Sequence, residues 1–374
     1  MHYTAHLPKD PTRKTSRERV LLLCAAISLI AFVVEQTLVS DNASSGVEAK
    51  EKAVQIMRNA LDALREHREK SGAGFDLTVD PNRTALIGEE YTEITTTPGS
   101  LEAKRTTTNP AMAGLIVQLL EEAGVVAGDT IAVGCSGSFP ALAVATLAAS
   151  KALGVTPVVV ASIGSSSYGA TNSDMTLPDV LDLLTRKGII EHQPDAVSLG
   201  GADDVGNEFE PEVRQRLIAG IAKSGIPLIL EPELQRNVAQ RLAVYFGPEG
   251  LRKIAAFVNI GGNYADLGTS PLILKLEPGV NRKIELPDNS QTHGVVFAMS
   301  KRHIPVVHLL YIKGLVLKYG LPWDPVPFPD AGGRKHSQAH ASLISPAGLT
   351  MLAYLVIISL MLLFYRNVFF RTHS

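Results

Sequence analysis

Short apolar runs alternate with longer segments whose apolar positions recur at helical spacing, from about residue 110 to residue 309. The runs predict strands, and the longer segments predict helices. The predicted strands are residues 130–133, 157–163, 196–199, 227–230, 254–260 and 304–309, and the predicted helices are residues 111–123, 141–153, 177–187, 212–223 and 238–245. Apolar strands alternating with helices are typical of a doubly wound α/β fold, a mostly parallel sheet with helices on both faces.

Two hydrophobic segments flank this region and predict the domain organisation. Residues 347–365 are long enough to cross a bilayer, and we interpret the shorter apolar core within residues 20–39 as an uncleaved anchor. Basic residues precede the first segment and follow the second, which predicts cytoplasmic termini and an extracytoplasmic domain: Lys9, Arg13, Lys14, Arg17 and Arg19, then Arg366 and Arg371. The predicted parts are residues 1–19 (tail), 20–39 (span), 47–70 (amphipathic stalk or packing helix), 71–330 (α/β domain), 347–365 (span) and 366–374 (tail).

Composition narrows the class of protein. The 374 residues carry a formal net charge of −2 and are 45% hydrophobic, which supports a sizeable core and excludes a disordered chain or a basic nucleic-acid binder. One cysteine, Cys24, lies in the first hydrophobic segment and the other, Cys135, in the domain, so no disulfide is expected.

The candidate site begins in the stretch DTIAVGCSGSFPAL, residues 129–142, which predicts a strand, a tight turn at residues 134–138 and a helix. The amino end of a helix entered through glycine and serine favours an anion or a developing oxyanion. Loops at the carboxyl ends of the strands of such a sheet meet at one edge, where ligands usually bind. The candidate ligand-binding residues at that edge are Gly134, Cys135, Gly137, Ser138, Ser165, Ser166, Ser167, Gly261, Gly262 and Asn263.

A catalytic interpretation centres on Ser136. The sequence G-C-S-G-S departs from the G-x-S-x-G nucleophile motif at Ser138, so a helix-capping serine is the ordinary alternative. A nucleophilic Ser136 needs a base and an acid, and His308 with Asp203 or Asp266 gives the order Ser, Asp, His along the chain.

Other chemistries stay open at this stage. Cys135 is an alternative nucleophile, although a small residue between strand and helix more often packs as a buried thiol, and His293 and His303 compete with His308 as the base. Asp203 and Asp204 are candidate metal ligands, but no second cluster has metal-ligand spacing, and no motif predicts a cofactor. GCSGSFPA and GSSS also resemble the phosphate-binding turns of sugar-phosphate isomerase-type domains, but such domains usually work in the cytoplasm, against the predicted topology.

Over most of residues 20–365 the chain resembles the poly-gamma-glutamate system proteins, a bacterial membrane-associated family. The resemblance lies in DTIAVGCSGSFPAL, VVVASIGSSSYGAT, NIGGNYADLG and IPVVHLLYIKGLVLKYGLPWDP. It implies a location at the bacterial cytoplasmic membrane and, as partners, poly-gamma-glutamate or its chain ends and other membrane components of the polymer complex. It implies no catalytic residues.

The resemblance and the predicted edge leave two classes of function. The first is a membrane-anchored accessory component of poly-gamma-glutamate synthesis or export, with a Gly/Ser-rich ligand site. The second is a serine-centred amide hydrolase or transferase that acts on the polymer. Because the domain is not basic, we expect recognition of glutamyl units or chain ends rather than of a long polyanion.

Overall fold

The structure, a computed structural model, describes Ser28 and residues 46–329. The chain divides into two compact units, Met1–Val47 with Lys335–Ser374 and Glu48–Arg334, and the second contains the α/β domain. No helix within the described residues combines the length and the apolar character that a membrane span requires. Apart from Ser28, the two predicted spans and both predicted tails lie outside the described residues.

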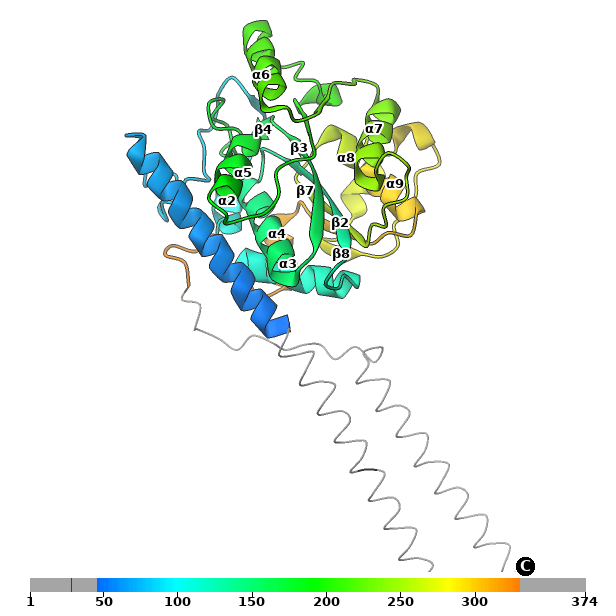
Figure 1. Cartoon of the computed structure of the whole chain (residues 1–374), viewed down its shortest axis with the longest axis horizontal. Coiled ribbons are helices and arrows are strands. Elements are labelled where there is room, and N and C mark those ends of the chain that lie inside the picture. Colours follow the sequence, from blue (N-terminus) through cyan, green and yellow to red (C-terminus); the bar gives the residue numbers. More distant parts are fainter. Residues whose placement is uncertain (1–27, 29–45, 330–374) are drawn as a thin grey trace, which may run out of the picture. The chain divides into compact units, whose positions relative to one another are not determined.

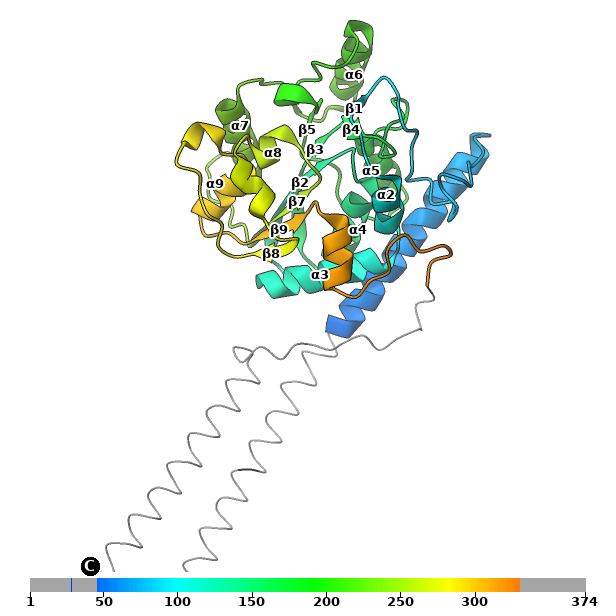
Figure 2. The same ribbon diagram turned by 180° about the vertical axis from the view of Figure 1, so that it is seen from behind.

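A central sheet has the strand order β6-β5-β3-β2-β7-β9-β8 (Figures 1 and 2). Its strands pair in parallel, except that β8 runs antiparallel to β9 at one edge. This confirms the predicted mixed α/β fold with a mostly parallel sheet. The strands are β2 (Thr130–Ser136), β3 (Thr156–Ser162), β5 (Ala196–Ser198), β6 (Leu228–Ile229), β7 (Ala256–Ile260), β8 (Gly279–Asn281) and β9 (Val306–Leu309), and a separate parallel pair joins β1 (Thr95–Thr97) to β4 (Ser165–Ser166).

Helices cover both faces of the sheet because alternate strand residues point to opposite sides. Val133 and Val159 pack into the core with α3, α4, α5 and α10, whereas Ala132 and Val160 pack into the core with α7 and α9. Helix α6 packs on Val197, on the side of α3 to α5. The bounds are α2 (Leu101–Thr107), α3 (Ala111–Ala123), α4 (Pro140–Leu153), α5 (Leu177–Arg186), α6 (Pro211–Ser224), α7 (Leu234–Phe246), α8 (Tyr264–Leu267), α9 (Val295–Lys301) and α10 (Ile312–Lys318), with short 3₁₀ turns at Ala202–Asp204, Pro271–Lys275 and Ser290–Thr292.

A long helix over residues 46–70 precedes these elements. Met57, Leu61 and Leu64 are buried on one of its faces and belong to the same core as α3 and α4. Gly114 of α3 makes room for this helix, because a Cβ at that position would lie 3.3 Å from Cγ2 of Val54. The helix therefore packs against the α/β domain along its apolar stripe.

Strand β2 extends further than the sequence pattern predicts. It continues through Gly134 and Cys135 to Ser136, in register with β7 as far as Cys135 and with β3 as far as Ser136, so the turn begins only at Gly137. Glycine and serine are poor strand formers, which is why the pattern suggests an earlier turn. The residues lie in the strand because both sides of β2 offer backbone partners.

The order of the strands reverses beside β2. From β2 the chain proceeds outward through β3, β5 and β6, and then returns to β7 and β9 on the opposite side of β2. The loops that follow β2 and β7 are therefore neighbours at the carboxyl edge of the sheet. In open α/β sheets this reversal is the usual position of a ligand site.

Candidate functional site at the β2/β7 edge

Three serines stand side by side at the carboxyl ends of neighbouring strands. Ser136 of β2 is in register with Ser162 of β3, and Ser162 is in register with Ser198 of β5. The hydroxyl oxygens of Ser162 and Ser198 are 2.8 Å apart. Residues in register on parallel strands share a face, so the three side chains lie on the side of the sheet that α7 covers.

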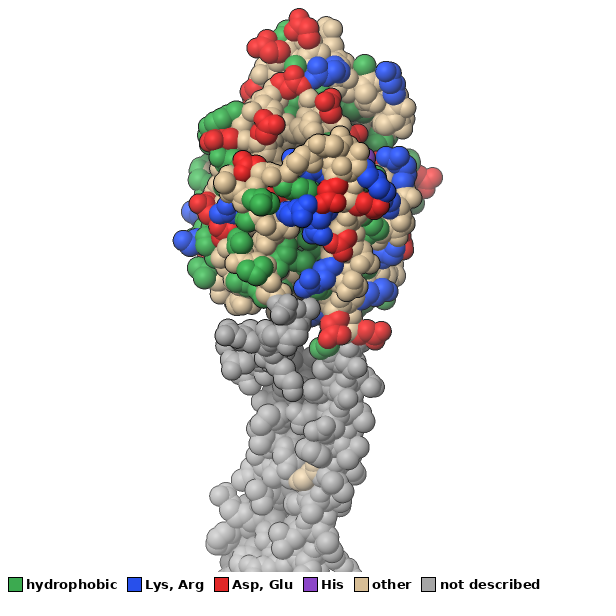
Figure 3. Space-filling view, turned by 90° about the vertical axis from the view of Figure 1, so that its left-hand side faces the viewer, with side chains coloured by type: hydrophobic (Ala, Val, Ile, Leu, Met, Phe, Trp, Pro, Cys, Tyr) green, Lys and Arg blue, Asp and Glu red, His purple; other side chains and the backbone are tan. Residues whose placement is uncertain are grey.

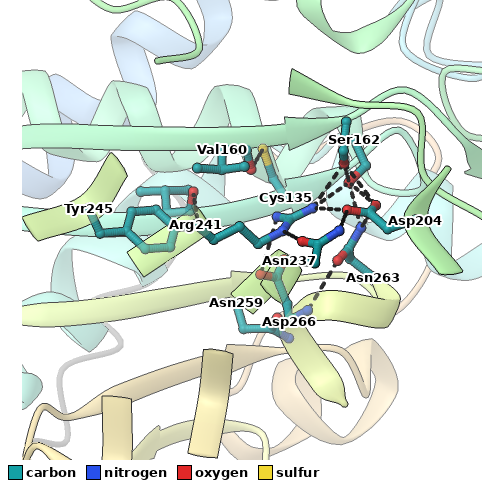
Figure 4. Close-up of polar contacts among 12 residues, drawn as sticks. Cys135, Val160, Ser162, Asp204, Asn237, Arg241, Tyr245, Asn259, Asn263 and Asp266 are labelled. Carbon is teal, nitrogen blue, oxygen red and sulfur yellow. Dashed lines mark hydrogen bonds and ion pairs between the residues drawn. The ribbon is translucent and has the colours of Figure 1, made fainter. Parts of the chain in front are cut away.

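A buried arginine from α7 reaches this row of serines. The guanidinium of Arg241 donates hydrogen bonds to Asp204 at 2.6 Å and to Ser198 Oγ at 2.9 Å, and lies 3.4 Å from Asp266 Oδ1 (Figure 4). Arg241 and both carboxylates are fully buried. Burial alone lowers the pKa of Arg241, but the charges of Asp204 and Asp266 outweigh it and raise the pKa above its ordinary value.

The carboxylate of Asp204 joins loops that are far apart in sequence. It accepts hydrogen bonds from Ser198 at 2.8 Å, from Asn237 at 3.0 Å and from Asn263 at 2.9 Å, in addition to Arg241. Asn263 also donates to Ser162, and its side-chain oxygen accepts from the backbone N–H of Asp266. The network therefore ties the carboxyl end of β3 and the loops after β5 and β7 to α7.

Asp266 is the member of this network with an unsatisfied atom. Among the described residues its Oδ2 has no hydrogen-bond partner. Burial raises its pKa to about 6, since the influence of Asp204 adds to desolvation while Arg241 only partly opposes it. A Cβ at Gly134 would lie 2.6 Å from Oδ2, so the glycine in β2 makes space for this carboxyl group.

Ser136 lies at the reversal of strand order itself. The residue is 4% exposed, and its Oγ has no hydrogen-bond partner among the described residues. A Cβ on Gly261, which follows β7 and has φ +83°, would lie 2.7 Å from that Oγ. The turns after β2 and β7 thus meet at a free buried hydroxyl, which is costly unless something binds it.

The structure does not join Ser136, His308 and an acid by hydrogen bonds. His308 of β9 is in register with Asn259 of β7, which is in register with Gly134, so β7 separates the histidine from the strand of Ser136. The Nδ1 of His308 is 3.2 Å from Nδ2 of Asn259, and burial lowers its pKa to about 4. Neither candidate acid is hydrogen-bonded to His308. Asp203 accepts a hydrogen bond from the side chain of Asn207, and Asp266 interacts with Arg241.

The serine loop after β3 packs on the turn after β2. Ser138 Oγ accepts from the backbone N–H of Ser166, and Ser165 Oγ donates to the carbonyl of Gly137. Ser167 is 1% exposed, and its hydroxyl has no partner in the described part of the chain. The predicted gathering of the two serine turns therefore occurs, and the structure places Gly261, Gly262 and Asn263 in the neighbouring β7 loop.

Cys135 points away from these serines. Its side chain is buried in the core shared with α3 and α4, with Sγ 3.8 Å from the carbonyl of Val160. Burial raises the pKa of the thiol to about 12, so it has little thiolate character at neutral pH. His293 contacts the carbonyl of Pro287 through Nε2, and His303 is exposed at the end of α9.

Sequence reasoning missed two central residues, Arg241 and Lys104. Arg241 lies four positions after Asn237, on the buried face of α7 that also holds Val238 and Tyr245. Two polar residues at helical spacing among apolar ones could have indicated a buried polar pair. Lys104 of α2 is 2% exposed and contacts both serine turns. Within the described residues no group of three or more His, Cys, Asp or Glu side chains is arranged to hold a metal ion.

Comparisons of the chain with protein-family models, with curated proteins and with solved structures find no match.

Proposed function

We propose that this protein is a membrane-anchored accessory component of a bacterial poly-gamma-glutamate system, and that its α/β domain binds a carboxylate of a glutamyl unit or chain end at the β2/β7 edge. The observation that carries the ligand site is the buried hydroxyl of Ser136 at the reversal of strand order, which has no partner among residues 46–329. The polymer and the membrane come from the sequence resemblance and from the hydrophobic segments.

The start of α4 supports a ligand with negative charge. No side chain caps this helix at Phe139, and its first turn contains no acidic residue. The free N–H groups and the partial positive charge of a helix amino end favour a carboxylate. The N–H groups of Gly137 and Phe139 already donate to the carbonyls of Ser162 and Ser136, so within the described residues the free backbone donor of this turn is the N–H of Ser138.

The distribution of charge favours a short recognition element over a polymer track. The chain has a formal net charge of −2, and Figure 3 shows acidic and basic side chains interspersed over the face it presents. A long polyanion is attracted by an extended basic surface, whereas one carboxylate needs only local donors. Binding fits Ser136 better than catalysis there, because no base in the described part of the chain is hydrogen-bonded to its hydroxyl.

The test is binding of short gamma-glutamyl oligomers to the full-length chain in detergent, followed by calorimetry. Ser136→Ala removes the unpartnered donor, and we expect about a tenfold loss of affinity, in line with one hydrogen bond to a charged group. Ser150→Ala is the matched control, because Ser150 is also a fully buried serine but bonds Thr146 within α4. Equal affinity of both variants and the unaltered chain would contradict the site, and binding of sugar phosphates instead would contradict the ligand class.

A further inference from the structure

Lys104 is a buried lysine that forms no salt bridge with any described carboxylate. Its Nζ donates to the carbonyl of Ser138, lies 2.6 Å from Ser166 Oγ, and stands 3.9 Å from the centre of the Phe139 ring. Buried lysines are rare unless paired, so its position between the two serine turns requires a reason.

Burial lowers the pKa of Lys104 to about 7, so a large fraction of the side chain is a neutral amine near neutral pH. A neutral amine has two N–H donors and one lone pair. In the structure Lys104 Nζ donates to the Ser138 carbonyl and to Ser166 Oγ. When the amine is neutral, its lone pair can instead accept the hydroxyl proton of Ser166 across the same 2.6 Å separation. Within the described residues that hydroxyl has no other hydrogen-bond partner.

We propose that Ser166 and Lys104 form a nucleophile–base pair that acts on the acyl carbon of an amide or ester. Ser166 Oγ attacks the carbonyl carbon while its proton passes to Lys104 Nζ. The carbon–nitrogen or carbon–oxygen bond then breaks, and Lys104 returns the proton to the leaving group. Water, deprotonated by the same amine, hydrolyses the acyl-serine.

The surroundings of Ser166 are suited to this role. Ser166 is 9% exposed, whereas Ser165 is fully buried and Ser167 is 1% exposed, so Ser166 is the member of its loop with surface toward solvent. Gly99 packs closely against the pair, because a Cβ there would lie 3.2 Å from both Ser166 Oγ and Lys104 Cε, so a side chain at this position would crowd the two reacting side chains. The next residue, Ser167, has a hydroxyl without a partner among the described residues, and in this proposal that hydroxyl donates to the developing oxyanion.

This activity goes beyond the proposed function, since it concerns a different serine and needs no polymer. Ser136 has a free hydroxyl without a base, which suits binding, and Ser166 has a base in contact, which suits covalent chemistry. The two proposals can therefore fail separately.

The test is reaction of the full-length chain in detergent with a fluorophosphonate probe. Ser166 Oγ would form a bond to phosphorus, fluoride would leave, and Lys104 would take the proton. We expect peptide mass spectrometry to locate the label on Ser166, with a rate that rises with pH around a midpoint of about 7. Lys104→Arg keeps a cation and donors but removes the base, and should slow labelling by about 100-fold or more.

Ser150→Ala is the control variant and should label as the unaltered chain does. Unaltered tryptophan fluorescence of Lys104→Arg would establish that its slow labelling is not caused by unfolding. Site location in the unaltered chain does not depend on any variant, so a folding defect leaves the test intact. The proposal is overturned if the folded chain takes no label on Ser166, or if Lys104→Arg labels at the rate of the unaltered protein.

Discussion

Replacing Asp266 by asparagine tests whether the buried network is strained by excess negative charge at neutral pH. Arg241 faces two carboxylates, so with both ionised the three buried groups carry one uncompensated negative charge. The amide has the shape of the carboxyl group and cannot ionise. The variant therefore reproduces the protonated form of Asp266 at every pH.

The magnitude follows from the proton affinity of Asp266. Its pKa is raised from 3.8 to about 6, so the folded protein holds this proton more tightly than the unfolded chain does. A raised pKa contributes stability that is fully present below about pH 4 and is lost as the pH rises through about 6. At about 1.4 kcal/mol per tenfold change in proton affinity, the loss is about 3 kcal/mol.

The assay is urea unfolding of both chains between pH 4 and pH 7, followed by the fluorescence of Trp323, the single tryptophan. Relative to the unaltered protein, Asp266→Asn should gain about 2 kcal/mol of unfolding free energy between the two ends of this range, because at pH 4 part of the total difference has already been lost. His308, whose pKa is lowered to about 4, makes the opposite contribution over much of this range, because it loses stability as the pH falls. It is present in both chains and cancels in the difference.

Asp182→Asn is the matched control, because it removes a carboxylate that pairs with Arg186 on the exposed side of α5. Its difference from the unaltered chain should be small at every pH. A difference for Asp266→Asn that stays constant from pH 4 to pH 7, or that changes in the opposite direction, would refute the reasoning.

Two further substitutions examine the same network by unfolding at pH 7. Arg241→Met leaves Asp204 and Asp266 buried without a counter-charge and should lower the unfolding free energy by about 3–5 kcal/mol. The control Arg186→Met removes a surface pair and should lower it by about 1 kcal/mol or less. Similar losses in the two variants would argue against a buried ionic network. Gly134→Ala places a Cβ 2.6 Å from Asp266 Oδ2 and should lower the unfolding free energy by about 1–3 kcal/mol. The control Gly220→Ala, where nothing lies within 4 Å of the added Cβ, should not destabilise α6. An unchanged stability of Gly134→Ala would show that the Asp266 carboxyl group moves freely.

The sheet was predictable because its signal is local. Runs such as residues 130–133 and 254–260 are apolar enough to be strands by themselves, and β2 and β7 lie where they were expected. The antiparallel β8 and the short helices α2, α8, α9 and α10 escaped prediction, since seven or fewer residues hold too few periodic positions. The end of β2 was predicted too early because a glycine usually indicates a turn. Gly134 is instead a strand residue whose missing side chain makes space for the carboxyl group of Asp266, 132 positions later, and no local pattern contains that contact.

The sequence predicts where the site lies in the sheet but not which side chains contact one another there. The polar residues that follow β2, β3 and β7 meet because parallel strands bring their carboxyl ends to one edge. Which of them pair is decided by distant side chains. From the sequence, Arg241 is expected on the exposed face of its helix, and only the structure shows that Asp204 and Asp266 lie beside it. Lys104 is likewise expected at the surface, because its segment is polar, but it is buried.

The polar side chains at the carboxyl edge of the sheet fall into two groups. Some are fully hydrogen-bonded to one another, and others have hydroxyls with few or no described partners. Arg241 and Asp204 each use several partners within the network, so a ligand there would have to displace existing bonds at a cost in stability. Among the described residues the hydroxyls of Ser136 and Ser167 have no hydrogen-bond partner, and the hydroxyl of Ser166 contacts only Lys104. We therefore place the proposed binding and the proposed chemistry in the two serine turns, and the arginine network holds the loops beside them.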